Sequence, residues 1–94
     1  MAFARVVSFE GVNSDRVAQV ASEIENDPRP DDIPATEILM LHDADAERSL
    51  VVMFFETDED YRRGDATLNA MTPGDTPGRR ASVDKFEVAF RRMA

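Results

Sequence analysis

A continuous apolar stretch, LVVMFF at residues 50–55, constrains the fold of this 94-residue chain more than any other feature. Valine and phenylalanine favour extended strands, and Thr57 follows as a suitable helix-capping residue. The stretch therefore predicts a strand over residues 49–56. A strand with one face in water alternates apolar and polar side chains, and this stretch does not alternate. Both faces of the sheet around it are therefore expected to be covered.

Three further segments have the composition or the alternation of strands. Residues 3–10 place Phe3 and Val7 on the same side of an extended chain. The apolar centre of residues 36–42 predicts a second strand, and the alternation within residues 82–90 predicts the last one.

Two amphipathic helices separate these strands. Apolar side chains recur at positions 17, 20, 21 and 24, so residues 15–26 predict a helix. The sequence TDED at residues 57–60 resembles a capping box and predicts a second helix from residue 58 to about residue 71. The order β-α-β-β-α-β is that of a single ferredoxin-like α+β domain over residues 1–94, with both helices on one face of a four-stranded antiparallel sheet. The other face would be bare in a monomer, so a second copy of the chain is its expected cover.

The composition argues against several functional classes. The chain has 19 acidic and 11 basic side chains and a net charge of −8, which disfavours nucleic acid and anionic membranes as partners. It contains no cysteine and one histidine, so we expect it to bind neither haem nor zinc tightly. No segment has the pattern of a signal peptide or of a membrane span, and the cytoplasm is the expected location. We expect no cofactor and no metal site.

The acidic segment at residues 43–47 resembles part of a calcium-binding loop. Asp43, Asp45 and Glu47 stand at alternate positions, as calcium ligands do. Arg48, however, occupies the position where that loop needs glycine, so a solvated hairpin is the preferred interpretation.

Two stretches carry a resemblance to a known family: ARVVSFEG at residues 4–11 and FFETDED at residues 54–60. Together with the element order and the chain length, they resemble the antibiotic biosynthesis monooxygenase-like domains of the dimeric α/β-barrel superfamily. This resemblance implies a homodimer whose two sheets pack face to face and, in enzymatic members, a pocket between sheet and helices. Some members oxidise quinol-like aromatic substrates with molecular oxygen and no metal or flavin, and others degrade haem. Haem degradation is not expected here, because the chain has no tryptophan and its only histidine is predicted on a strand.

His42 and Tyr61 are the candidate catalytic residues. His42 ends the second predicted strand and is the default general base near neutral pH. The alternative interpretation is a histidine at the rim of the sheet, beside Asp43 and Asp45. Tyr61, in the first turn of the second helix, either donates a hydrogen bond into a pocket or is a core tyrosine whose hydroxyl reaches the surface.

Gly64 and Asn69 complete the candidate ligand-binding set with Tyr61. A glycine in the middle of a helix costs about 1 kcal/mol relative to alanine. Gly64 therefore either permits a close approach of the sheet or leaves room for a ligand. Asn69 lies off the inward side of the helix, which favours a contact with solvent or with a loop.

Two further features involve arginine side chains, namely an arginine on a predicted central strand and a loop that ends in two arginines. Arg5 lies on a strand expected to be central and needs a carboxylate partner, for which Glu87 and Glu10 are the candidates. The segment 72–78, rich in proline and glycine, is followed by two arginines. It predicts either a lid or an anion hook over a pocket, or an ordinary surface loop.

These observations leave two functions open. One is a small-ligand-binding or structural homodimer without catalysis. The other is a cofactor-independent monooxygenase-like enzyme acting on a small aromatic, quinol or polyketide-like compound, with His42 and Tyr61 as its proton-transfer groups. A solid core beside Tyr61 favours the first function, and a ligand pocket there favours the second.

Overall fold

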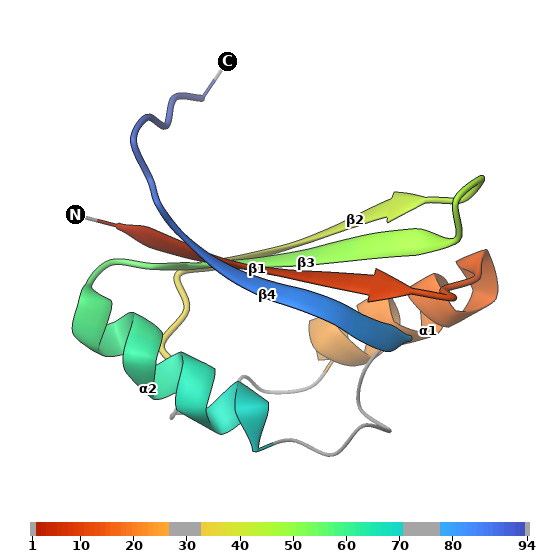
Figure 1. Ribbon diagram of the computed structural model, residues 1–94, viewed down its shortest axis with the longest axis horizontal. Helices are drawn as coiled ribbons and strands as arrows, with labels where there is room; N and C mark the ends of the chain where they lie inside the picture. The colour runs from red at the N-terminus through yellow and green to blue at the C-terminus, as the bar shows by residue number, and fades with distance from the viewer. Residues whose placement is uncertain (1, 27–32, 71–77, 94) are drawn as a thin grey trace.

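The structure, a computed structural model, describes residues 2–26, 33–70 and 78–93 (Figure 1). Their secondary-structure elements follow in the order β1 (Phe3–Glu10), α1 (Ser14–Asn26), β2 (Glu37–Asp43), β3 (Arg48–Phe55), α2 (Asp58–Asn69) and β4 (Arg79–Glu87). The four strands form one antiparallel sheet in the order β2-β3-β1-β4. The predicted ferredoxin-like α+β fold is confirmed.

Each helix begins at a capping side chain, and both helices lie on the same side of the sheet (Figure 1). At α1, the Asn13 side-chain oxygen accepts a hydrogen bond from the Arg16 N–H at 2.8 Å. At α2, the Thr57 hydroxyl oxygen accepts one from the Asp60 N–H at 3.0 Å, as its sequence position predicts. These bonds satisfy backbone donors that the first turn of a helix leaves without a partner.

The last strand differs from its predicted bounds at both ends. It begins at Arg79 rather than at position 82, because this part of β4 pairs with the end of β1, where Arg79 lies opposite Glu10. It ends at Glu87 rather than at position 90, because Glu87 lies opposite Phe3, where β1 itself begins. Beyond Glu87 the chain leaves the sheet on the side opposite the helices (Figure 1).

The side of the sheet that faces the helices carries the core. Buried apolar residues form two groups, which are Ile33, Ala35, Phe55 and Tyr61 in one, and Val7, Phe9 and Val12 in the other. Met53 packs against the first group and Val51 against the second. Every second residue of the apolar stretch in β3 therefore points toward the helices.

The other side of the sheet is the open face, which no described helix covers. Cross-strand pairing places these apolar residues on it: Val6, Leu39, Leu41, Leu50, Val52, Phe54 and Phe86. The remaining residues of the apolar stretch thus point away from the helices. This explains why the stretch does not alternate, because both sides of β3 are apolar.

Candidate functional site

His42 lies near the end of β2, directly opposite Ser49 of β3. Its Nδ1 is hydrogen-bonded to the buried Ser49 Oγ at 2.8 Å, and its Nε2 is buried with no partner among the described residues. Asp43 points to the opposite side of the strand, where its carboxylate accepts a hydrogen bond from the Ala46 N–H at 3.2 Å. The imidazole of His42 is therefore partly buried on the helix side of the sheet. Its partner is a serine and not the neighbouring Asp43 carboxylate that the alternative interpretation names.

A hollow of about 150 Å³ opens at this end of the hairpin that joins β2 and β3. It is lined by Leu41, His42, Asp43, Arg48, Ser49 and Leu50. The Nε2 atom of His42 is inaccessible to solvent, so a molecule in this hollow does not reach it without rearrangement. Ser49 is not among the predicted site residues, although the short hairpin already places it close to His42.

Tyr61 is a core residue. Its ring packs edge-on against Phe55, with 5.5 Å between centroids and 72° between the ring planes. Burial raises the pKa of the Tyr61 phenol above its ordinary value of 10.0, and the nearby Asp65 carboxylate raises it further. The phenol is therefore protonated at neutral pH, so it can donate a hydrogen bond but is not a phenolate base.

His42 and Tyr61 lie at opposite ends of the sheet. His42 contacts Ser49, and Tyr61 packs against Phe55. Ser49 and Phe55 are six residues apart on the same strand, which corresponds to about 20 Å of extended chain. The two candidate catalytic side chains therefore do not form one site.

Gly64 lies on the side of α2 that meets the sheet, as predicted. A Cβ atom at this position would lie 2.5 Å from Cε1 and 2.7 Å from Cζ of Phe55. Close approach of the sheet is therefore the reason for glycine here, and the Phe55 ring fills the space that the missing side chain leaves.

The partner of Arg5 is Asp65 of α2, not Glu87 or Glu10. Its Nε donates to Asp65 Oδ1 at 2.8 Å, and the arginine side chain is only 5% exposed. Glu10 lies on the other side of β1, where it pairs with Arg79. The prediction was wrong because it considered partners on strands, whereas Arg5 points at a helix.

Asn69, the last residue of α2, is exposed to solvent as predicted and also contacts two arginines. Its Oδ1 accepts hydrogen bonds from Arg5 Nη2 at 3.2 Å and from Arg80 Nη2 at 2.6 Å. Its Nδ2 donates to Asp65 Oδ2 at 3.2 Å. Helical spacing places positions 58, 65 and 69 on one face of α2, but it does not show which residues of the sheet that face meets.

Lys85 makes the corresponding contact at the other end of α2, where it pairs with Asp58. Its Nζ also lies 4.7 Å from the Tyr61 ring centroid and 4.9 Å from that of Phe3. The Lys85 ammonium, hydrogen-bonded to Asp58, lowers the pKa of that carboxyl below its ordinary value of 3.8.

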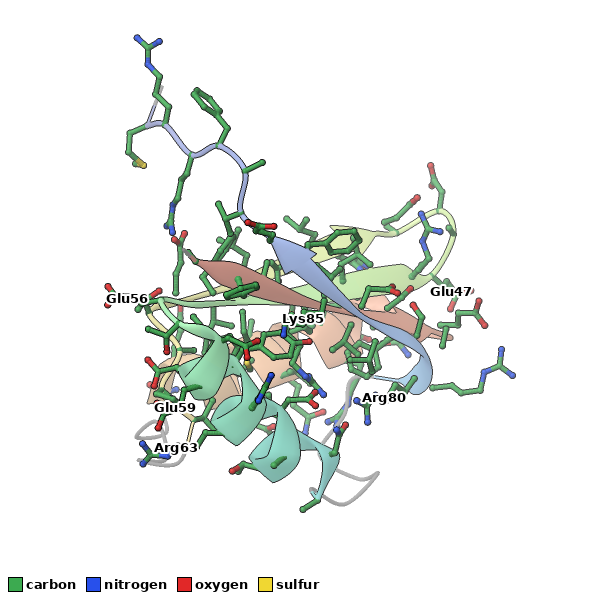
Figure 2. The ribbon with its side chains drawn as sticks, turned by 60° about the vertical axis from the view of Figure 1, so that its left-hand side comes forward. Glu47, Glu56, Glu59, Arg63, Arg80 and Lys85 are labelled. Carbon is green, nitrogen blue, oxygen red and sulfur yellow. The ribbon has the colours of Figure 1, made fainter. Side chains whose placement is uncertain are left out.

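We call this row of contacts the polar seam of α2, which consists of Arg5, Asp58, Asp65, Asn69, Arg80 and Lys85. Figure 2 shows Lys85 and Arg80 on the side of the sheet that α2 occupies. The seam brings together residues from β1, α2 and β4.

Three further predictions concern a metal site, a membrane span and a lid or anion hook. No group of three or more histidine, aspartate or glutamate side chains within the described ranges is placed to hold a metal ion. No described helix is long and apolar enough to cross a membrane. The predicted lid or anion hook lies mostly outside the described residues, while the two arginines that follow it belong to β4.

Comparison with known proteins adds no family. No protein-family model matches the chain, and a search of curated proteins finds no match.

Proposed function

We propose that this chain is a homodimeric α/β-barrel module without catalytic activity, in which the open faces of two copies pack against each other. The exposed apolar surface of the open face carries this proposal. Leu39, Leu41 and Phe86 are 40%, 50% and 55% exposed. Single domains rarely leave a contiguous apolar surface in water, because its burial is the main favourable term in association.

Charged residues at one end of the open face make it complementary to a second copy. Cross-strand pairing aligns Asp43 with Arg48, Arg48 with Glu10, and Glu10 with Arg79. The signs alternate along this row. A two-fold axis brings the same surface of two copies together, so a row of alternating sign can meet opposite charges in its copy.

The segment after β4 adds apolar surface on the same side of the sheet. Arg91 fastens it to the open face, where it pairs with Glu37 and lies 4.7 Å from the centroid of the Phe54 ring. Phe90 and Met93, on either side of this anchor, are 81% and 89% exposed. These two side chains are available for burial against a partner.

The non-catalytic part of the proposal rests on the placement of the candidate residues. His42 and Tyr61 are at opposite ends of the sheet, and Phe55 fills the space beside Gly64. Proton transfer to a bound substrate requires an acceptor within hydrogen-bond reach of it. A solid core beside Tyr61 is the arrangement expected of a structural or binding module.

Light scattering at micromolar concentration tests the dimer. The wild-type protein should have twice the 10.5 kDa mass of the chain, through an interface of about 1,500 Å² or more. Leu41→Glu should yield monomers, because it places a charge among the exposed apolar side chains of the open face. Ile24→Glu is the matched control, since Ile24 is an exposed apolar residue on α1, at 41% against 50% for Leu41, and its variant should stay dimeric. A wild-type mass of one chain would refute the dimer.

Oxygen uptake tests the proposed absence of catalysis against the monooxygenase-like alternative. With a panel of dihydroxy-aromatic compounds, the wild-type protein should not exceed the uncatalysed rate in an oxygen electrode. Enzymatic uptake that His42→Ala or Tyr61→Phe lowers about 10²-fold or more would establish the enzyme instead, since that is the usual effect of losing a general base.

A further inference from the structure

The polar seam of α2 carries more positive than negative charge. Three cations of the sheet each meet one polar residue of α2, in the pairs Lys85 with Asp58, Arg5 with Asp65, and Arg80 with Asn69. Two of the three helix residues are carboxylates, and the third is a neutral amide. The seam therefore has an excess of one positive charge at its Asn69 end, within a chain whose net charge is −8.

Two of the cations converge on one atom. Arg5 and Arg80 both donate to Asn69 Oδ1, at 3.2 and 2.6 Å. Asp65 compensates the charge of Arg5, whereas the oxygen of an amide carries only a partial charge, so the charge of Arg80 is compensated incompletely. Arg5 is almost fully buried, and water therefore screens its repulsion from Arg80 less than it would at an open surface.

We propose that the guanidinium groups of Arg5 and Arg80 form an oxyanion-binding site, which takes the carboxylate or phosphate group of a small ligand. The ligand oxygen binds at the position that Asn69 Oδ1 occupies in this structure. Hydrogen bonds from arginine to an anionic oxygen are about twice as strong as those between neutral groups, and the planar guanidinium matches both carboxylate and phosphate. This site lies on the helix side of the sheet, so it is independent of the proposed dimer.

The surroundings of the two arginines allow this exchange. Asn69 is exposed and is the last residue of α2, so its side chain can turn outward without disturbing the core. Asp65 holds Arg5 through the Nε–Oδ1 bond at 2.8 Å, which does not involve Asn69. The buried guanidinium therefore stays in position whether an amide or an anion lies against it.

A purely structural role for the same contacts makes a different prediction. The last turn of α2 has no basic residue, and cations stabilise the negative end of a helix dipole. Arg80 could serve that purpose alone. Its replacement would then lower stability, and the protein would bind no anion at this site.

A chemical-shift titration separates the two roles. Inorganic phosphate and, in a second series, acetate are added to the ¹⁵N-labelled protein, with chloride keeping the ionic strength constant. Saturable shifts in the millimolar range are expected at Arg5, Asn69 and Arg80. A response to phosphate alone assigns a phosphate ester as ligand, and a comparable response to acetate assigns a carboxylate.

Arg80→Gln should weaken this binding at least about tenfold, the loss expected for one charge-assisted hydrogen bond. Arg79→Gln is the matched control, because it removes the same charge from the neighbouring residue, which pairs with Glu10 on the other side of the sheet. It should change the affinity by less than about twofold.

Asn69→Asp gives a second readout that does not depend on removing an arginine. Its carboxylate would occupy the site permanently, so phosphate and acetate should no longer bind while the fold stays intact. Shifts that grow without saturation, equal weakening by Arg79→Gln, or unchanged binding in the Asn69→Asp protein would overturn the proposal. Anion binding is read from the chemical shifts and the dimer from the mass of the particle, so a failure of one proposal is distinguishable from a failure of the other.

Discussion

Gly64 shows how one residue can set the distance between a helix and a sheet. Alanine at this position would gain about 1 kcal/mol of helix propensity. Its Cβ would, however, lie 2.5 Å from an atom of the Phe55 ring, which is 0% exposed and packed against Tyr61. Overpacking of a rigid core costs about 1–3 kcal/mol, which exceeds the gain in helix propensity, so Gly64→Ala should lower the free energy of unfolding by up to about 2 kcal/mol in urea titrations.

A second substitution checks that Phe55 is the cause. In a Phe55→Leu background the ring is absent, and Gly64→Ala should then be neutral or stabilising by about 1 kcal/mol. An equal loss of stability in both backgrounds would show that Gly64 is required for another reason.

The long-range partners of the candidate residues are harder to predict than the role of Gly64. The helical spacing of α2, which depends on nearby residues alone, is enough to place Tyr61 and Gly64 on its inward side. The partner of Arg5 lies 60 positions away in the sequence. Such a pairing depends on how the helix sits on the sheet, and local patterns contain no information about that.

At the scale of elements, the two ends of α2 favour opposite charges, because the helix dipole is positive at its first turn and negative at its last turn. Its first turn has three acidic residues, Asp58, Glu59 and Asp60, at the positive end of the helix dipole. The Lys85 ammonium and the nearby Arg62 guanidinium both lower the pKa of Asp58. This end of the helix is therefore stabilised by a charge that acid can remove.

The pH dependence follows from the direction of that shift. The pKa of Asp58 is lower in the folded protein than its ordinary value of 3.8, so the unfolded chain takes up the proton first as the pH falls. The stabilisation is complete above that ordinary value and is lost as the pH falls through the folded pKa. Asp58→Asn should thus be less stable than wild type at pH 7, and the difference should disappear at low pH.

Urea titrations of both proteins at several pH values measure this effect. Lys85→Gln removes the main cause of the shift, so in that background Asp58→Asn should have a smaller and flatter effect. A difference between wild type and Asp58→Asn that persists below the folded pKa would mean that the carboxylate does not stabilise through its charge.

The elements themselves were largely predictable because their patterns are local. Alternation identified β1 within its observed bounds, and the spacing of apolar residues identified α1 to within one residue. The end of β4 was not predictable in the same way. Val88 and Phe90 continue the alternation of that strand, yet after the hydrogen bond from the Val88 N–H to the Ala2 carbonyl at 2.9 Å no further pairing with β1 follows. The length of a strand is set by its neighbour as well as by its own sequence.

At the scale of the whole molecule, the two exposed surfaces of the sheet differ in character. Every residue of the edge strand β4 is exposed, and its charged members include Asp84, Lys85 and Glu87. Charged side chains on an edge strand oppose the addition of further strands. The open face is apolar by contrast, so association of two copies through the faces is favoured over growth along the β4 edge.

Dimerisation through the open face makes thermal stability depend on protein concentration. Unfolding of a dimer releases two chains, so a hundredfold increase in concentration stabilises the folded state by about 2.7 kcal/mol. For two chains of this size the corresponding rise in Tm is about 5–10 °C. Calorimetry of the wild-type protein over that range should show this rise, whereas Leu41→Glu should melt at one temperature throughout. A wild-type Tm that does not change with concentration would mean that the apolar open face remains in contact with water.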